Sequence, residues 1–343
     1  MVSEAGPAQG ARIVLAHGGG GELTRELIRR RIVPRLSNEA LDRLTDAAVL
    51  DRPAGRVCLT TDSYVVQPLE FPGGDIGRLA VCGTVNDLAV MGAVPVALSL
   101  ALVLEEGFPL ASLDRVLDSV AAAAGEAGVP VVTGDTKVVE HGRGDGLIIN
   151  TTGLGVLPEG GGLSDAPIEA GDAVLVTGRI AEHGLAVLSA REGLSFRTEL
   201  RSDVAPLTGL VRAMLAAGAQ VKFMRDPTRG GLAGVLADLS EDAALSIEVQ
   251  EAAVPLSAAA LHAAEMLGLD PLTVANEGKC LAVTPAADAE RLLRACRAHP
   301  LGRRAAVIGR FTGAAPPLVE LVTRSGGRRI VQRPYGEELP RIC

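Results

Sequence analysis

Residues 71–104 read FPGGDIGRLAVCGTVNDLAVMGAVPVALSLALVL, and this stretch decides the fold class. From Asp75 to Met91 the apolar residues recur at helical spacing. Gly92 and Pro95 end that helix, and Val96 to Leu104 is an apolar run of strand length. A helix followed by a buried strand is typical of α/β layers, so we expect an α/β protein.

The uncharged part of this stretch, residues 88–104, is close to the length that could span a membrane. Gly92 and Pro95 interrupt it, so a helix end, a turn and a strand explain it better. The chain starts without a basic segment followed by an apolar one, which argues against secretion. The five cysteines have irregular spacing and no CxxC pair. This usage indicates reduced thiols, and we expect a cytoplasmic protein.

Length and composition favour two domains. The chain has 343 residues, of which 48% are hydrophobic and 2% aromatic, with no Trp, so its cores must be aliphatic. A Pro-, Gly- and Ser-rich stretch near residues 158–171 looks like a connection. We therefore predict an N-terminal domain at 1–158, a C-terminal domain at 168–325 and a flexible tail at 326–343. The net charge of −8 argues against a nucleic-acid or anionic-membrane surface.

Apolar runs and helical segments alternate along both halves. We predict helices at residues 22–33, 110–127, 207–217, 231–239 and 258–267, and another after Glu182. Strands are predicted at residues 57–61, 131–133, 147–156, 173–177, 279–283, 305–310 and 318–322.

Five acidic residues lie at expected strand ends or in Gly-rich turns: Asp62 in TTDS, Asp75 in GGD, Asp87 in NDLA, Asp135 in GDTK and Asp226 in RDPT. In α/β proteins such positions carry ligands. Converging carboxylates suit Mg²⁺, which takes its other ligands from nucleotide phosphates. Each of them could instead cap a turn, but five together favour a shared site.

Four consecutive glycines, Gly18, Gly19, Gly20 and Gly21, precede a helical segment. Their backbone amides could surround an anion at the helix N-terminus. A flexible surface loop explains them about equally well. The loop matches neither a Walker A sequence nor a dinucleotide fingerprint.

The chain ends in Pro340-Arg341-Ile342-Cys343. Pro340 disfavours a helix, so we expect an extended, mobile end that could visit a second site. An ordinary frayed terminus is the simpler alternative. A free thiol is only a few per cent ionised at pH 7, so Cys343 would be a carrier that a partner loads.

Lys137 and Glu277 flank glycines in expected loops and could equally be surface charges. The remaining thiols and imidazoles show no metal spacing, and we expect them to be structural: Cys58, Cys82, Cys280, Cys296, His141, His183, His262 and His299.

Seven segments, in order, resemble the HypE family of hydrogenase-maturation proteins: LAHGGGGELT, TTDSYVV, FPGGDIGRLAVCGTVNDLAVMGA, VTGDTKVV, RDPTRGGLA, ANEGK and the terminal PRIC. The resemblance covers nearly the whole chain, and PRIC sets this family apart from the related aminoimidazole ribonucleotide synthetases, selenide water dikinases and thiamine monophosphate kinases. It implies two α/β domains with ATP between them and a homodimer formed through the N-terminal sheet.

The resemblance also implies a reaction. A carbamoyltransferase, HypF, loads a carbamoyl group onto Cys343, and ATP-dependent dehydration turns the S-carboxamide into an S-cyanide. A HypC–HypD scaffold then accepts the cyanide for the iron of [NiFe]-hydrogenase. By motif, Glu277 or Lys137 is the base. Magnesium ligands would be Asp62, Asp87, Asp135 and Asp226, and the nucleotide would be held by Gly18, Gly19, Gly20, Gly21, Asp75, Asn86 and Gly134.

Two other functions remain open. A small-molecule kinase of the same superfamily would keep the acidic residues and ATP but not need the tail. A non-catalytic scaffold that binds maturation partners is the other alternative, and the concentration of carboxylates at loop ends argues against it. A selenophosphate synthetase would have a reactive cysteine near the glycine loop, whereas the first cysteine is Cys58.

Overall fold

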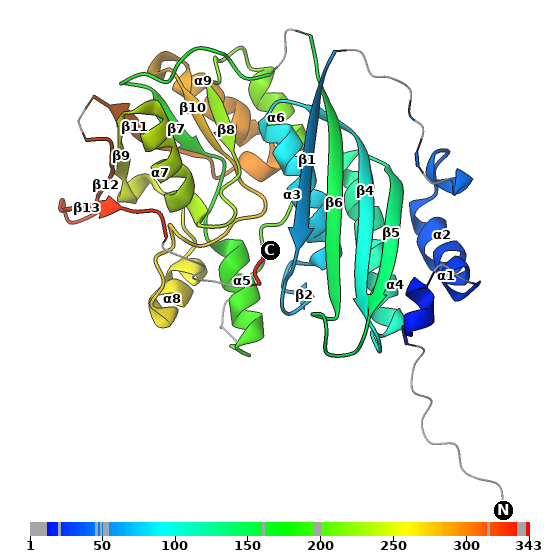
Figure 1. Cartoon of the computed structure of the whole chain (residues 1–343). Coiled ribbons are helices and arrows are strands. Elements are labelled where there is room, and N and C mark those ends of the chain that lie inside the picture. Colours follow the sequence, from blue (N-terminus) through cyan, green and yellow to red (C-terminus); the bar gives the residue numbers. More distant parts are fainter. Residues whose placement is uncertain are drawn as a thin grey trace, which may run out of the picture.

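The computed structural model describes residues 12–19, 22–44, 47–48, 50, 55–159, 162–194, 200–313, 316–334 and 341–343. Two β-sheets stand side by side, each with helices against it (Figure 1). The predicted two-domain α/β fold is therefore confirmed. The described helices include none that is both long and apolar enough to cross a membrane.

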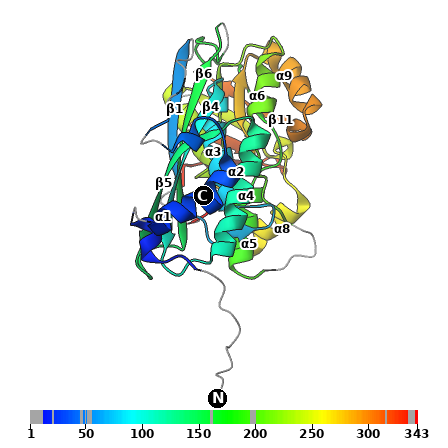
Figure 2. The ribbon, with the colours of Figure 1, turned by 90° about the vertical axis from the view of Figure 1, so that its right-hand side faces the viewer.

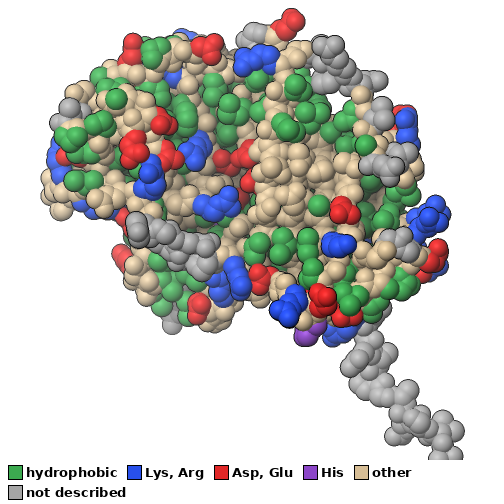
Figure 3. All heavy atoms as spheres, viewed as in Figure 1, with side chains coloured by type: hydrophobic (Ala, Val, Ile, Leu, Met, Phe, Trp, Pro, Cys, Tyr) green, Lys and Arg blue, Asp and Glu red, His purple; other side chains and the backbone are tan. Residues whose placement is uncertain are grey.

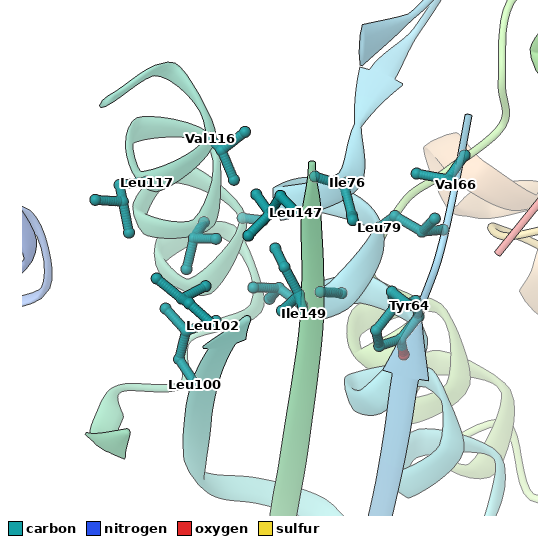
Figure 4. Packing of buried hydrophobic residues seen from close by; sticks show 14 of the residues in the cluster. Tyr64, Val66, Ile76, Leu79, Leu100, Leu102, Val116, Leu117, Leu147 and Ile149 are labelled. Atoms are coloured by element: carbon teal, nitrogen blue, oxygen red, sulfur yellow. The ribbon is translucent and has the colours of Figure 1, made fainter. Parts of the chain in front are cut away.

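The N-terminal sheet has the strand order β1-β6-β4-β5, formed by Arg56–Tyr64, Leu147–Leu157, Val94–Glu105 and Val131–Val139. Only β4 and β5 are parallel. Helices α3 (Ile76–Val90) and α4 (Leu110–Ala127) cover one face. Ile149 and Leu102 project from the sheet towards Leu117 of α4 and Ile76 of α3, forming an aliphatic core (Figure 4). The helix, turn and strand expected over residues 75–104 are confirmed.

Short helical segments lie beyond β5: η1 (Leu15–Gly18), α1 (Glu22–Leu27), the π-helical turn η2 (Ile28–Ile32), α2 (Val33–Leu36) and η3 (Leu41–Arg43). Figure 2 shows α2 beside α4. Arg35 of α2 binds Asp118 of α4 at 2.5 Å. The predicted helix at residues 22–33 is thus divided by a π-turn, which places these segments along the edge of the sheet.

The other face of the N-terminal sheet carries no helix in the described part of the chain (Figure 1). Side chains along β1 alternate, as expected for a strand with one covered face. Asp62 points inwards, whereas Val57 and Leu59 point outwards and are 59% and 70% exposed. Few charged side chains lie over this outer face (Figure 3). It is the face that remains free to pack against another molecule.

The C-terminal sheet has the order β13-β12-β9-β11-β7-β10-β8. In chain order its strands are β7 (Ala173–Val176), β8 (Phe223–Arg225), β9 (Ser246–Gln250), β10 (Leu281–Thr284), β11 (Ala306–Thr312), β12 (Val319–Val322) and β13 (Arg328–Val331). Helices of this half are α5 (Glu182–Arg191), α6 (Thr208–Leu215), α7 (Gly231–Ala243), α8 (Ala258–Leu267) and α9 (Ala286–Ala298). A small hairpin, β2 (Glu70–Phe71) and β3 (Gly74–Asp75), precedes α3.

Three local predictions need correction. The residues Gly134, Asp135 and Lys137 lie inside β5 and not in a loop. Gly134 allows this because its backbone passes so close to Leu100 that a Cβ would lie 2.1 Å from the Leu100 carbonyl oxygen. The predicted tail starts too early, because Arg328–Val331 pairs with β12 after a tight turn. Strand β9 and helix α9 were not predicted at all.

Candidate active site

The last three residues of the chain lie between the two domains (Figure 1). The Ile342 side chain is 3% exposed and packs in the N-terminal core. The Arg341 carbonyl accepts hydrogen bonds from the Gln67 amide at 3.1 Å and from Arg191 at 2.6 Å. The Arg341 guanidinium pairs with Asp145 at 3.2 Å. Residues 335–340 of the predicted flexible tail lie outside the described residues.

His183, near the N-terminus of α5, also holds this end of the chain. Its Nε2 lies 2.9 Å from the Ile342 carbonyl oxygen and its Nδ1 lies 2.8 Å from the Ser202 hydroxyl. The ring is fully buried and meets Phe71 edge-on. Burial lowers the pKa of His183, so the imidazole is neutral. We expected this histidine to be structural, and no local sequence signal distinguishes it from the other three.

The Cys343 sulfur lies against one cation and one acid. Arg229 Nη1 is 3.8 Å from the sulfur, and the Glu277 carboxyl hydrogen-bonds to the thiol. Burial and the nearby Glu277 raise the pKa of Cys343 well above its usual value, while Arg229 opposes that rise. The thiol is therefore held in its protonated form, as a carrier would be.

Glu277 is buried, with 2% of its surface exposed, and its Oε1 has no hydrogen-bond partner among the described residues. Burial, followed by repulsion from Asp226 and Asp203, raises its pKa well above the usual value. An unpaired carboxylate oxygen in the interior is costly. Its position beside the thiol indicates a polar group still to be bound there.

The loop that carries Glu277 is fixed by Asp203 and Asn86. Asp203 accepts from the amides of Glu277 at 3.2 Å and Gly278 at 3.1 Å, and it pairs with Lys279 at 3.1 Å. A Cβ on Gly278 would lie 1.8 Å from the Asp203 carbonyl oxygen, so only glycine fits. The Asn86 amide nitrogen donates to the Glu277 carbonyl at 3.2 Å. Asn86, predicted to bind nucleotide, is thus engaged in joining the two domains.

Three of the predicted carboxylates meet close to Cys343 and Glu277. Asp62 of β1 and Asp87 of α3 are hydrogen-bonded to each other, and Thr60 donates to Asp87 at 2.7 Å. Burial, and to a smaller extent Asp62, raise the pKa of Asp87 to about 6. Burial and then Asp87 raise the pKa of Asp226, in the loop after β8, to about 7. Their mutual repulsion favours a cation at this point.

The described residues contain no group of three or more His, Cys, Asp or Glu side chains arranged as a complete metal site. Mg²⁺ often takes only one or two protein carboxylates and completes its shell with water and phosphate oxygens. The paired carboxyls of Asp62 and Asp87 fit that partial donor set. Asp226 interacts electrostatically with both of them, and this repulsion adds to the rise of its pKa.

The other predicted residues lie elsewhere in this chain. Asp135 and Lys137 are exposed on β5, at the opposite edge of the sheet from β1. Gly18 packs on β5, where a Cβ would lie 2.4 Å from the Val138 amide nitrogen. A cavity of about 610 Å³ between the N-terminal helices and β5 is lined in part by Gly134 and Asp135. These residues form a second group, which we call the β5 group.

Asp75, Gly19, Gly20 and Gly21 complete the predicted set. The Asp75 side chain caps α3 by accepting from the Arg78 amide at 2.9 Å. Gly19 is exposed next to η1. Gly20 and Gly21 lie outside the described residues.

Comparisons with known proteins identify this arrangement. The family model of the AIR synthase related protein N-terminal domain matches residues 44–157, and that of the C-terminal domain matches residues 169–317. Carbamoyl dehydratase HypE of Azotobacter vinelandii is 52% identical over 331 residues, which cover 96% of this chain and 97% of that protein.

Two solved structures extend the comparison to three dimensions. A hydrogenase maturation protein HypE in complex with ATP superposes with a TM-score of 0.91 at 42% identity, covering 96% of this chain and 99% of the other. A chain from a HypE–HypF complex gives a TM-score of 0.78 at 45% identity, covering 92% and 100%. The chain therefore belongs to the HypE family of carbamoyl dehydratases in hydrogenase maturation, within the AIR synthase related proteins.

Proposed function

We propose that this dehydratase uses ATP to remove water from an S-carboxamide carried on Cys343, which leaves an S-cyanide on the same sulfur. One observation carries the proposal: the partly buried terminal thiol contacts Glu277 and Arg229, which in turn interact with the carboxylates Asp226 and Asp62. A frayed terminus would have no such contacts.

The chemistry proceeds in two steps. The amide oxygen attacks the terminal phosphorus of ATP and ADP leaves, while one N–H proton is lost, so the carbon becomes an O-phosphorylated imidate on sulfur. The second N–H proton is then removed, the C≡N triple bond forms and the C–O bond breaks with inorganic phosphate as the leaving group. Phosphate leaves far more readily than hydroxide, and this is the reason for using ATP.

Glu277 is our choice for the base. A carboxylate whose pKa is raised by burial is a stronger base than an exposed one, and it already contacts the sulfur that bears the carbamoyl group. Lys137, the alternative, lies on β5, at the opposite edge of the sheet from β1. Arg229 would stabilise the negative charge that develops on the transferred phosphoryl group or the carbamoyl oxygen.

Asp62, Asp87 and Asp226 would hold Mg²⁺ together with the phosphates of ATP. The metal supplies charge neutralisation of the phosphoryl group when it is bound. With the cation bound, these three carboxylates would keep the phosphate end of the nucleotide next to Cys343. We retain Asp135 in the predicted metal set, and Gly18–Gly21, Asp75, Asn86 and Gly134 in the predicted nucleotide set.

The β5 group and the Cys343 site were predicted to form one active site but lie apart in a single chain. A homodimer would explain this if the two groups met across its interface. The outer face of the N-terminal sheet exposes Val57 and Leu59 in a region with few charges (Figure 3). Packing two such faces together would bury this apolar surface. Lys137 and Asp135 also project from that side of the sheet, so a second copy would bring them near the interface.

The biological setting follows from the family. We propose a cytoplasmic protein that receives carbamoyl groups from HypF and passes cyanide to the iron of [NiFe]-hydrogenase through a HypC–HypD scaffold. The relative solved as a HypE–HypF complex supports the first partner. The domain limits of 1–158 and 168–325 are likewise a proposal, supported by the two family-model matches.

Mass spectrometry of the intact chain tests this function. After incubation with the carbamoyltransferase, carbamoyl phosphate and ATP, the terminal peptide should gain a carbamoyl group and then lose one water. A variant lacking only Cys343 should bind ATP but carry neither group. Full maturation activity without Cys343 would favour the kinase alternative. ATP hydrolysis that does not depend on carbamoylation of the protein would contradict the dehydration mechanism.

A further inference from the structure

We propose that His183 is a positioning residue, which holds the Ile342 carbonyl and thereby keeps the Cys343 thiol against Glu277. This inference rests on the proposed function of Cys343 as the carrier. It concerns how residues 341–343, the docked end of the chain, are held in place, and His183 is not one of the groups that react in that function. His183 itself does not touch the sulfur in the described contacts, so its effect must pass through the backbone of Ile342.

The hydrogen-bond network fixes which ring nitrogen carries the proton. The Val204 amide donates to the Ser202 hydroxyl oxygen at 3.1 Å, which leaves the hydroxyl hydrogen free to point at His183 Nδ1, 2.8 Å away. The Ile342 carbonyl oxygen can only accept, so Nε2 must carry the hydrogen that it donates at 2.9 Å, and in the neutral ring Nδ1 is then the acceptor. Every polar atom of the ring therefore has a partner, and the ring has one tautomer.

The same short segment also fixes the acid. Ser202 orients His183, and its neighbour Asp203 accepts the amides of Glu277 and Gly278. Two adjacent residues thus determine the position of the terminal peptide and the position of the carboxyl beside it. Because one segment positions both the thiol and the base, the distance between them stays fixed. Proton removal from a bound carbamoyl group requires such a fixed distance.

The docked end depends on these hydrogen bonds because its backbone is strained. Arg341 has φ +55°, in the left-handed region that non-glycine residues rarely adopt. The contacts of its carbonyl with Gln67 and Arg191, and of the next carbonyl with His183, hold it there. Loss of the His183 bond should therefore let the terminal residues leave the site more often.

Two variants of the full chain separate hydrogen bonding from packing. His183→Gln can place an N–H donor near the position of Nε2, whereas His183→Leu fills the space without a donor. The first measurement is the rate at which iodoacetamide alkylates Cys343, followed by mass spectrometry. The second is the rate of water loss from protein that has already been carbamoylated. Circular dichroism and thermal unfolding check that both variants are folded.

For His183→Leu we expect alkylation about fivefold to tenfold faster and water loss slower by a similar factor, the scale of one lost hydrogen bond. We expect His183→Gln to stay within about threefold of the unmodified protein in both assays, on the same scale. Equal defects in the two variants would show that ring packing matters and would overturn the inference. So would unchanged rates in His183→Leu.

Ser202→Ala provides a second route if His183→Leu does not fold. This variant leaves the ring in place but removes the hydroxyl that donates to Nδ1, and we expect smaller changes in the same directions. Unchanged alkylation and water loss in Ser202→Ala would contradict the proposed network. Failure of the proposed function itself looks different: the unmodified protein would then form no S-cyanide, whatever stands at position 183.

Discussion

Arg229 Nη1 lies 3.8 Å from the Cys343 sulfur, although the two residues belong to distant parts of the chain. Interaction with the thiol, and also with Asp62 and Glu277, raises the pKa of Arg229. The guanidinium is thus the one cation shared by the carrier, the candidate base and the candidate metal ligands in the described contacts of this site. Its positive charge offsets the repulsion between nearby acidic side chains such as Asp62 and Glu277.

Replacing Arg229 by Gln should slow water loss from the carbamoylated protein by on the order of 10²-fold, because one preorganised donor at the reacting group is removed. Arg229→Lys should recover part of the rate by restoring the charge without the forked donors. Arg333→Gln is a suitable control, since Arg333 binds Asp238 and Glu241 at the surface. A full rate in Arg229→Gln would remove Arg229 from the mechanism.

Replacing Glu277 by Gln keeps the size of the side chain but removes the base. We expect carbamoylation of Cys343 to persist and water loss to fall by roughly 10² to 10⁴-fold, so the carbamoylated form accumulates. Intact-mass spectrometry over time measures both species. Formation of S-cyanide at the usual rate by this variant, together with its loss in Lys137→Met, would make Lys137 the base.

The buried pair of Asp203 and Lys279 should contribute strongly to stability. Both side chains are nearly inaccessible to solvent, and Asp203→Ala would leave the Lys279 ammonium without its partner. Breaking a buried pair in this way costs about 3–5 kcal/mol of unfolding free energy. Glu70→Ala, which breaks the exposed pair with Arg115, should cost far less, because water screens that pair. Urea denaturation of both variants checks the contrast, and equal losses would contradict it.

His183 should make the folded protein less stable in mild acid. Burial holds its folded pKa below the usual value near 6.5, while Asp203, the charged group that faces it, opposes that shift. Below about pH 6.5 the unfolded chain therefore binds more protons than the folded one. The free energy of unfolding accordingly decreases as the pH is lowered.

Urea denaturation between about pH 5.5 and 7.5, the range in which a histidine titrates, measures this dependence. The contribution of His183 is the difference between the two pH profiles of the unmodified protein and His183→Gln. We expect the free energy of unfolding to decrease less in His183→Gln than in the unmodified protein as the pH is lowered. Parallel profiles would show that His183 keeps its usual pKa.

Leu59→Glu should weaken the proposed homodimer, because it places a charge in the middle of the exposed face of β1. Met266→Glu is the matched control, since Met266 is 71% exposed on α8, in the other domain. Light scattering after size exclusion gives the molar mass of each. Dimers that persist in Leu59→Glu at low micromolar concentration would exclude an interface on this face.

The amino-acid sequence determined the elements whose signals are local. The helix and strand at residues 75–104 were predictable from apolar spacing and from Gly92 and Pro95, and the helix at residues 110–127 was found with the bounds of α4. The seven motifs pointed to the family, and they also marked Asp62, Asp87, Asp226, Glu277 and Cys343, which the structure brings together. Strand β13 was not predicted because two of its four residues are arginines and three are exposed, so it has no apolar strand pattern.

Only the tertiary structure decided which of these residues meet. Asp135 and Lys137 carry motifs as distinctive as those of Asp62 and Glu277, yet β5 places them at the far edge of the sheet. His183 carries no motif and nevertheless binds the carbonyl of the penultimate residue. Local pattern fixes the helices, strands and turns because these depend on neighbours in the chain. Contacts between distant residues depend on how two domains and a terminal segment pack, and no local spacing encodes that packing.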